Sequence, residues 1–227
     1  MVLARDKLLQ ASENLQCSAR FASVSAVDDL RGLRERKKQA TREALRLAAL
    51  RLAVEKGWEQ VRVEDIAAEA GVSTRTFNNY FASKDAAFLA TAYDRGARMR
   101  AALAGRPAQE PLWSAVINAV VDGFATDTVD LRQARRITPT PTLAAEQLKA
   151  TVVIEQGLAE GIARRIGADP EQDPYPRLVA AAVISATRVT IEHWLRTESG
   201  LAFPPVLRDA LERVAAGLPL PTDRRPG

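Results

Sequence analysis

Residues 66–84, IAAEAGVSTRTFNNYFASK, have the pattern of one helix, a tight turn and a second helix. An apolar stripe comes before Gly71, which can end the first helix in a left-handed backbone conformation. Ser73 follows at the position where a hydroxyl group caps the next helix. This segment constrains the fold more than any other part of the chain, because it predicts a compact helical hairpin.

The second helix of this hairpin has two different faces. Phe77 and Phe81 are four residues apart, so they share one face and are expected to anchor the helix to the core. At about 100° per residue, Arg75 and Asn79 point the opposite way. Arg, Asn and Thr side chains can match the donors and acceptors that base pairs present in the major groove. We therefore predict four base-reading residues: Arg75, Thr76, Asn78 and Asn79.

The hairpin and its flanks combine a Gly-Trp pair with the motifs DIAxxAGVS, TFxxYF and SK at fixed offsets. With these motifs, residues 34–89 resemble the DNA-binding half of the tetracycline-repressor (TetR) family of bacterial regulators, and the rest of the chain resembles it in helical layout only. The resemblance implies a helix-turn-helix domain, a helical ligand-binding and dimerisation domain, and a homodimer that most often represses transcription. The alternative interpretation of the motif is an ordinary buried helical hairpin.

Two places depart from the family pattern. Arg62 stands where the family usually has Thr or Ser before the second helix, so a cap generally worth about 1 kcal/mol is expected to be missing. A phosphate contact from Arg62 would compensate for that loss. At Asn78 and Asn79 the family more often has an aromatic or basic residue in at least one place. The operator sequence therefore cannot be taken from a relative.

The positive charge of the chain is concentrated in its first part. The net charge is +4, but residues 1–100 carry 18 Lys and Arg against 13 Asp and Glu, whereas residues 101–227 carry 14 against 15. Lys84 follows Ser83 at the start of the predicted fourth helix, where orphan amides and the helix dipole favour a phosphate. Basic side chains ahead of and along the first helix also suit DNA phosphates. The predicted phosphate contacts are Arg36, Lys37, Lys38, Arg62, Tyr80 and Lys84.

The composition excludes several classes of function. Cys17 and His193 are the only residues of their types, so His-rich zinc sites are excluded and Ser-His-Asp or Cys-His catalysis would have to use His193. We therefore expect no catalytic residues, no metal site and no cofactor. The start of the chain lacks the apolar core of a signal peptide, and the longest apolar run, LVAAAVI, is too short to span a membrane. These features predict a cytoplasmic protein without a membrane partner.

The apolar fraction of 47% and the low aromatic content of 5% favour an all-α fold with a packed core. We predict a poorly ordered extension over 1–33, the helix-turn-helix domain over 34–83, the ligand-binding and dimerisation domain over 84–217, and a frayed tail over 218–227. In the third of these segments, Pro and Gly separate helices predicted at about 84–103, 111–128, 131–137, 141–166, 174–197 and 204–216.

The part of the chain after residue 84 is where a regulator would bind its signal. Large apolar side chains there can line a cavity between helices, with Arg135 and His193 as polar anchors, although plain core is the alternative for each. The ligand predicted from this set is small and apolar or amphipathic. Arg188 and Glu192, four residues apart, are expected to form a surface ion pair. The predicted pocket residues are Tyr93, Trp113, Phe124, Arg135, Ile154, Leu158, His193 and Trp194.

The penultimate helix, PRLVAAAVISATRVTIEHWL, is apolar on more than one side. Such a helix must be buried on both sides, against its own domain and against a partner. With the last helix it is predicted to form half of a four-helix dimer interface, as the family resemblance also implies. The predicted interface residues are Ala182, Ser185, Ala186 and Val189.

Together these features predict a dimeric transcriptional regulator that binds a palindromic operator in double-stranded DNA and is released by a small ligand. Two alternatives belong to other classes of protein. A ligand-independent architectural DNA-binding protein would bind DNA with little sequence preference. A helical enzyme acting on a lipid-like substrate would need Asp, Glu or Lys chemistry, since His and Cys are almost absent.

Overall fold

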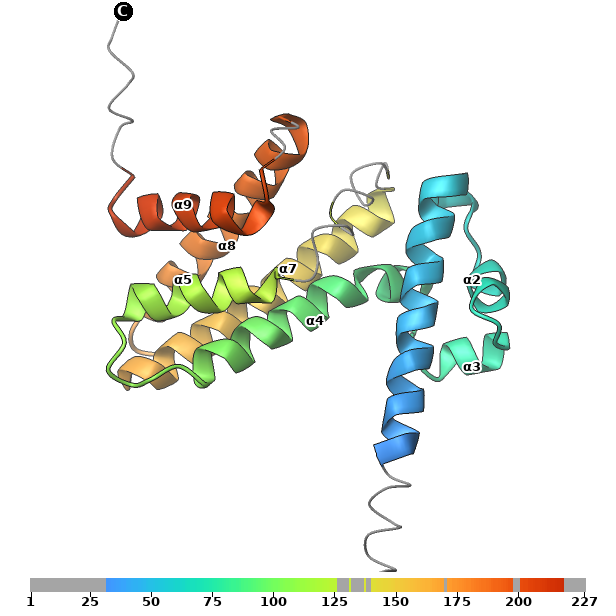
Figure 1. Cartoon of the computed structure of the whole chain (residues 1–227), viewed down its shortest axis with the longest axis horizontal. Coiled ribbons are helices and arrows are strands. Elements are labelled where there is room, and N and C mark those ends of the chain that lie inside the picture. The colour runs from blue at the N-terminus through green and yellow to red at the C-terminus, as the bar shows by residue number, and fades with distance from the viewer. Residues whose placement is uncertain are drawn as a thin grey trace, which may run out of the picture. The chain divides into compact units, whose positions relative to one another are not determined.

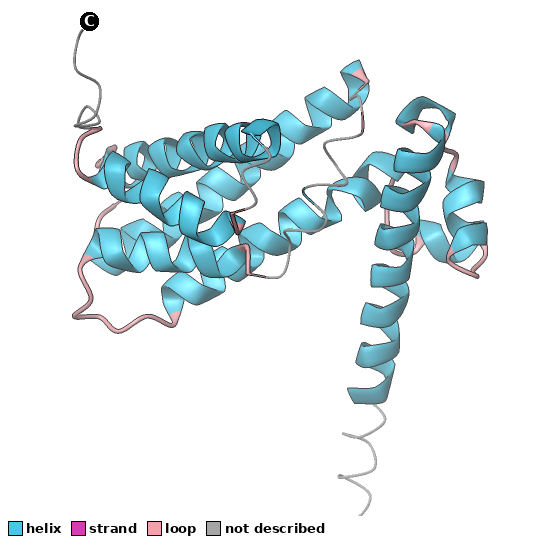
Figure 2. Cartoon of the chain, turned by 45° about the horizontal axis from the view of Figure 1, so that its top comes forward, coloured by secondary structure: helices cyan, strands magenta, loops and turns pink. Residues whose placement is uncertain are grey.

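The computed structural model describes residues 32–125, 131, 137, 140–169, 171–197 and 201–218, and these are helical wherever they have regular secondary structure (Figure 2). The chain divides into two compact units, residues 1–45 and residues 46–227. Most of the predicted extension, most of the predicted tail, Arg135 and nearly all of the predicted helix at 131–137 lie outside the described residues, whereas residues 32 and 33 of the predicted extension belong to the first described helix.

The first described helix covers residues 32–56 and is followed by the elements of the predicted hairpin. These are η1 (Trp58–Gln60), α2 (Val63–Glu69) and α3 (Thr74–Asn78), labelled in Figure 1 where there is room. Gly71 lies between α2 and α3 with φ of 68°, and Gly57 precedes η1 with φ of 78°. Both values favour glycine, and the predicted helix end at Gly71 is confirmed.

Among the described residues of the second unit, five longer helices follow: α4 (Lys84–Ala104), α5 (Leu112–Gly123), α7 (Pro141–Ile166), α8 (Tyr175–Thr197) and α9 (Phe203–Ala215). In Figure 1, α4 lies beside α5 and α7, and α8 packs between α7 and α9. Thr140 caps α7, because the Leu143 amide donates to Thr140 Oγ1 at 3.1 Å. Gly167 then ends α7 with φ of 69°.

The core of the second unit includes three aromatic side chains from α8, α9 and the end of α5. The ring of Phe203 lies 5.0 Å from that of Phe124 and 5.3 Å from that of Trp194, measured between centroids. All three are at most 4% exposed, and the Trp194 indole N–H donates to the Leu201 carbonyl at 2.8 Å. Burial of one such side chain generally stabilises a fold by about 1.5–3 kcal/mol.

Two glycines let α4 approach its neighbours closely. A Cβ on Gly96 would lie 2.8 Å from Ile154 Cγ1 of α7, and a Cβ on Gly123 would lie 2.6 Å from Met99 Cγ of α4. Contacts this short do not occur, so any larger residue would force the helices or these side chains to shift. The position of α4 against α5 and α7 therefore depends on residues without side chains.

Helix α8 is the one helix among the described residues that is long and apolar enough to cross a membrane, with a mean hydropathy of 1.2 over its best window. This corrects the prediction that no segment approaches a spanning helix. One third of that window is buried inside the protein, and Val179 and Val183 belong to the core. A helix that packs in a protein core can be equally long and apolar, so length and composition alone do not make α8 a membrane span.

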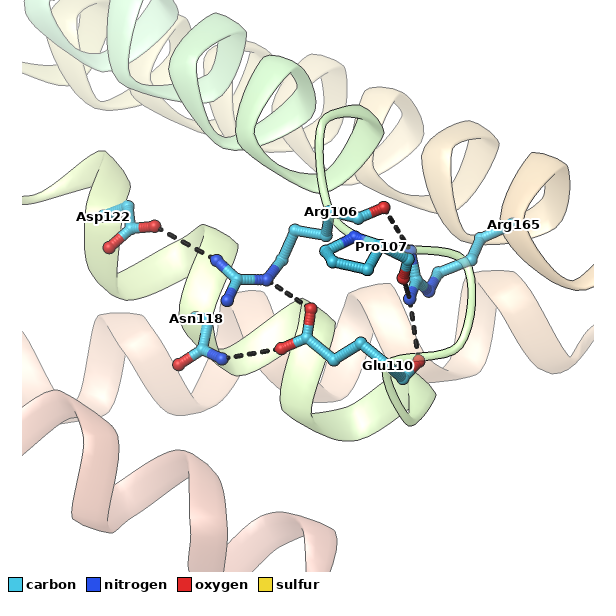
Figure 3. A network of polar contacts seen from close by, with 6 residues as sticks. All are labelled: Arg106, Pro107, Glu110, Asn118, Asp122 and Arg165. Atoms are coloured by element: carbon cyan, nitrogen blue, oxygen red, sulfur yellow. Dashed lines mark hydrogen bonds and ion pairs between the residues drawn. The ribbon is translucent and has the colours of Figure 1, made fainter.

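A polar network fixes the turn between α4 and α5 (Figure 3). Glu110 accepts a hydrogen bond from Arg106 Nε at 2.5 Å and another from Asn118 Nδ2 at 2.9 Å. Arg106 also lies 3.5 Å from a carboxylate oxygen of Asp122. The hydrogen bond from Arg106 is the main reason why the pKa of Glu110 lies below its usual value of 4.5.

Helix α7 joins the same turn through Arg165 (Figure 3). Its Nη2 donates to the carbonyls of Pro107 and Glu110 at 2.6 and 2.7 Å. A guanidinium carries several donors in one plane, so the single side chain of Arg165 can bond to both of these carbonyls, which lie in the turn and not in a helix. The network therefore attaches the α4–α5 turn to α7, on the other side of α4.

The network predicts a pH-dependent stability. Because the pKa of Glu110 is lower in the folded protein than in the unfolded chain, its contribution to the free energy of unfolding is present above pH 4.5 and is lost as the pH falls through the lower folded value. Glu110→Gln is therefore expected to lower Tm at neutral pH, and its difference from wild type should shrink in acid. Thermal unfolding monitored by circular dichroism between neutral pH and pH about 3 checks this. Glu160→Gln, at an exposed ion pair of 3.8 Å, is the control, and a pH-independent deficit in Glu110→Gln would contradict the prediction.

Candidate nucleic-acid interface and ligand cavity

Helix α3 is short, and both its ends are held by specific contacts. The Thr76 amide donates to Ser73 Oγ at 3.1 Å, which confirms the predicted cap. Phe77 is fully buried and Phe81 is 5% exposed, with 5.8 Å between their ring centroids. Phe81 follows the end of α3, but its amide still donates to the Phe77 carbonyl at 3.0 Å. The predicted aromatic anchor is thus confirmed, and it holds a helix of five residues in place.

The anchoring leaves three of the predicted base-reading side chains in solvent. Arg75 and Asn78 are exposed on α3. Asn79 is also exposed, but it is the C-cap residue directly after α3, whereas the prediction placed it within the helix. Thr76 is half-buried, and its hydroxyl lies 2.9 Å from that of Ser73. Thr76 is therefore part of the helix cap as well as a neighbour of the exposed residues.

Arg62 precedes α2 and is exposed. A guanidinium has no acceptor, so its side chain cannot cap the helix as Thr or Ser would. The Arg62 amide instead donates to Asp65 Oδ2 at 3.1 Å, which is the reciprocal half of a capping box. The predicted loss of a side-chain cap is thus partly offset by Asp65, and the Arg62 side chain extends into solvent at the N-terminus of a helix.

Lys84 has a structural function that the sequence did not reveal. Its ammonium group donates to the carbonyls of Trp58 and Val61 at 2.9 and 2.8 Å, and it lies 5.0 Å from the centre of the Trp58 ring. An ammonium group has three donors, so a DNA phosphate at this residue would use the third. Trp58 is 2% exposed, and its indole N–H donates to Asp85 at 2.9 Å. Lys84 therefore ties η1 to the start of α4.

The other predicted phosphate contacts are Arg36, Lys37, Lys38 and Tyr80. Arg36, Lys37 and Lys38 are all exposed on the helix of residues 32–56, in the first compact unit. Tyr80 is half-buried directly after α3. Each of these side chains is thus placed where a phosphate oxygen can reach it.

A cavity of about 430 Å³ opens in the second unit between α4, α7, α8, Phe124 at the end of α5, and Arg46 and Leu50 of the helix before η1. Met99, Phe124 and Ile184 contribute apolar surface to it, and Arg46 and Arg95 contribute positive charge. The volume lies within the range of about 300–1,000 Å³ that is typical of small-molecule sites. The predicted ion pair of Arg188 and Glu192 is present at the cavity, with 2.7 Å between Nη1 and Oε1.

Most of the predicted pocket residues that the structure describes do not line this cavity. Phe124 and Ile154 do line the cavity. The remaining described candidates are Leu158 and Trp194 in the core, Trp113 packed against the core, Tyr93 half-buried beside the cavity helices, and His193 exposed on α8. The apolar side chains of Leu158, Trp113 and Trp194 are thus accounted for by the core, which is the alternative left open for each predicted residue.

Most of the cavity residues that the prediction did not name lie on the helix of residues 32–56 and on α4, α7 and α8. Thr91, Arg95 and Met99 follow one another at steps of four and all line the cavity. Such spacing places them on one helix face. This periodicity was present in the sequence, but only the positions of α7 and α8 show that this face of α4 borders a cavity.

Two of the predicted dimer residues are exposed in the protomer. Ser185 is exposed and Val189 is 54% exposed, whereas Ala182 is half-buried. Leu178, which is 63% exposed, extends this stripe along α8 at helical spacing. Ala186 is half-buried and packs against the core, so it is partly used within the protomer. No large apolar side chain is exposed on α9, all of whose residues are described.

Two regions of the chain match known protein families. Residues 45–91 match the family model described as bacterial regulatory proteins of the tetR family, and residues 110–219 match a model described as the MftR C-terminal domain. The chain is 36% identical over 208 residues to the HTH-type transcriptional regulator TcmR of Streptomyces glaucescens, covering 86% of this chain and 92% of TcmR. It is 30% identical over 188 residues to MftR of Mycobacterium tuberculosis, described as a regulator of mycofactocin biosynthesis, covering 81% and 93%.

A solved structure, that of a SmeT–triclosan complex, has a similar fold. Its TM-score is 0.55 at 16% sequence identity, and the similarity covers 82% of this chain and all of the SmeT chain. At this identity the likeness concerns the fold alone.

The contacts of Lys84 predict a loss of stability on substitution. Lys84→Met keeps the length of the side chain but removes two charge-assisted hydrogen bonds, each generally worth about 1.5–3 kcal/mol. We expect the free energy of unfolding to fall by at least about 1.5 kcal/mol, as measured by urea denaturation. Lys149→Met, at a side chain 68% exposed on α7, is the control and should have little effect. Equal stability of the two variants would show that Lys84 does not hold η1 to α4.

Proposed function

Because the chain belongs to the TetR family of bacterial transcriptional regulators, we propose that it is a repressor that binds a palindromic operator as a homodimer and is released by a small ligand. Members of this family are DNA-binding regulators and not enzymes. The site of action that follows for such a bacterial regulator is the cytoplasm.

The exposed side of α3 is the observation that carries the proposed operator binding. Arg75, Asn78 and Asn79 extend into solvent from a helix that Ser73 caps and Phe77 anchors, so they are presented on a rigid support. These residue types read base edges, and Thr76 adds a hydroxyl or methyl contact. The phosphate contacts that we propose in addition are Arg36, Lys37, Lys38, Arg62, Tyr80 and the third donor of Lys84.

The cavity supports release by a ligand. Its walls include α4, which begins at the contact between Lys84 and η1, and they also include Arg46 and Leu50 of the helix that precedes η1. A ligand that prefers the cavity in the non-binding state would shift the protein toward that state, typically by about 1–3 kcal/mol. The structure of SmeT, which has a similar fold, is that of a complex with triclosan.

The apolar stripe of α8 supports the dimer. Leu178, Ala182, Ser185 and Val189 lie at steps of three and four residues and are exposed or half-buried in the protomer. Small side chains among them allow a second α8 to approach closely. In a symmetric dimer, the two α3 helices, one from each chain, must lie about 34–36 Å apart to enter successive major grooves. The operator must then have the same two-fold symmetry, so it is palindromic.

Asn79→Ala tests the reading of bases. An amide that contacts adenine contributes about 1–3 kcal/mol of discrimination, so affinity for the operator should fall by about tenfold while affinity for random DNA is unchanged. Gel-shift titration on both DNAs at one salt concentration measures this. Ser114→Ala, at an exposed position of α5, serves as the control. Equal losses on the two DNAs would contradict a base contact from Asn79.

Ser185→Arg tests the dimer face. The substitution places a long charged side chain in the middle of the α8 stripe, and burial of an unpaired charge generally costs several kcal/mol. We expect a folded monomer by light scattering, with operator binding lost because one head makes half the contacts. Ser114→Arg is the matched control, since it adds the same side chain to an exposed position of α5. A stable dimer of Ser185→Arg with wild-type affinity would place the interface on another surface.

A further inference from the structure

We propose that α7 and α8 together form the dimer interface, and that Leu148 and Val152 of α7 meet a second copy of this chain beside the stripe of α8. This inference rests on the proposed dimer and adds the helix that completes its interface. It differs from the prediction made from the sequence, in which the last helix, α9, had this position.

The stripe of α8 is too narrow to form a stable interface alone. It consists of Leu178, Ala182, Ser185 and Val189, and only Leu178 and Val189 carry large apolar side chains. A stable interface generally buries about 800 Å² on each partner and draws on about 20–30 residues of each. A second helix must therefore contribute apolar surface next to α8.

Helix α9, which is described over its whole length, does not offer such a surface. Its exposed residues are Pro205, Asp209, Glu212 and Arg213, and its other residues are buried or half-buried. Arg213 Nε donates to Asp209 Oδ2 at 2.8 Å, in an ion pair within α9 itself. Charged residues are depleted in the core of protein interfaces, so this face of α9 is suited to water rather than to a partner.

Helix α7 has an apolar face that reaches the stripe of α8. Leu148 and Val152 are exposed and four residues apart, so they share one face of the helix. Glu155 continues this face three residues later, and it lines a surface hollow together with Leu178 and Ala181 of α8. The face of α7 and the stripe of α8 therefore adjoin at this hollow.

The packing of α7 on α8 places Val152 and Leu148 beside the later part of the stripe (Figure 1). The cavity is lined by residues within 147–154 of α7 and within 184–192 of α8, whereas the hollow is lined by Glu155 and by residues within 177–181. Earlier positions on α7 thus lie beside later positions on α8. From Glu155 back to Leu148, the apolar face of α7 follows the stripe of α8 from Leu178 toward Val189.

The chemistry of this surface suits a second copy of the same chain. In a symmetric dimer the same surface of both chains meets, so a charge near its centre would face an identical charge, which is unfavourable. Leu148 and Val152 of α7 carry no charge, and neither do the four residues of the α8 stripe. The surface can therefore pair with itself without such repulsion.

The two helices of this surface also form walls of the cavity. Thr151 of α7 and Ile184 of α8 line the cavity, and the next residue of each helix, Val152 and Ser185, is exposed. A ligand that changes the packing of these walls therefore also changes the surface on which the two chains meet. The distance between the two α3 helices of a dimer depends on that surface.

Substitution of two neighbouring valines tests the proposal. Val152 and Val153 are 46% and 47% exposed, but they point in directions about 100° apart around α7. Val153 lies on the side of Lys149, which donates to Glu146 in solvent. We expect Val152→Arg to raise the dissociation constant of the dimer at least about a hundredfold, because it buries an unpaired charge, and Val153→Arg to leave it unchanged. Analytical ultracentrifugation of the full chain over a range of concentrations measures both.

Two further measurements separate this interface from other arrangements. Glu212→Arg reverses a charge on the exposed face of α9 and should leave the dimer intact, so its dissociation would place α9 in the interface and overturn the proposal. Circular dichroism compares the folding of all variants. A Val152→Arg chain that unfolds, instead of forming a folded monomer, would show that Val152 is covered within its own chain and would also overturn the proposal. Equal dissociation constants of Val152→Arg and Val153→Arg would do the same.

Ser185→Arg on α8 separates this inference from the proposed function. If Ser185→Arg dissociates and Val152→Arg does not, the proposed dimer stands and the part assigned to α7 is wrong. If the wild-type protein is itself a monomer on operator DNA and in solution, the proposed dimer fails and the interface fails with it. Dissociation of both variants, with Val153→Arg and Glu212→Arg still dimeric, is the expected result.

Discussion

The ammonium group of Lys84 connects α4, which is one wall of the cavity, to η1. We call η1 and the helix-turn-helix hairpin of α2 and α3 the head. The ammonium group donates to the carbonyls of Trp58 and Val61, while the indole of Trp58 donates to Asp85 in the first turn of α4. The ring of Trp58 also packs against Phe88 at 5.0 Å between centroids. These contacts fix where η1 lies at the start of α4. The position of α2 and α3 after η1 depends on them.

Two different parts of α4 contact the head and the cavity. Its first turn joins the head, and its middle, at Thr91, Arg95 and Met99, forms a wall of the cavity. The close approaches at Gly96 and Gly123 leave little freedom between α4 and its neighbours in the core. A packed interface of this kind shifts as a unit rather than deforming locally. This is a physical basis on which a change at the cavity can reach the head.

The head and the cavity differ in how well their residues could be predicted from sequence. In the head, Ser73, Gly71, Phe77 and Phe81 act through their immediate neighbours in sequence, and the structure has them as predicted. For the cavity, only Phe124 and Ile154 of the predicted residues line it. A large apolar side chain fits a core as well as it fits a cavity. Composition cannot distinguish the two, and Leu158 and Trp194 are in the core.

The sequence by itself determined the all-helical fold, the helix ends at Gly71 and Thr140, and the exposed set on α3, because caps, turns and helical periodicity depend on local spacing. The tertiary structure alone decided that Lys84 bonds two carbonyls more than twenty residues before it, and that Arg46 and Arg95 both line one cavity. Such contacts join residues that are far apart along the chain, and their partners are set by how the helices pack.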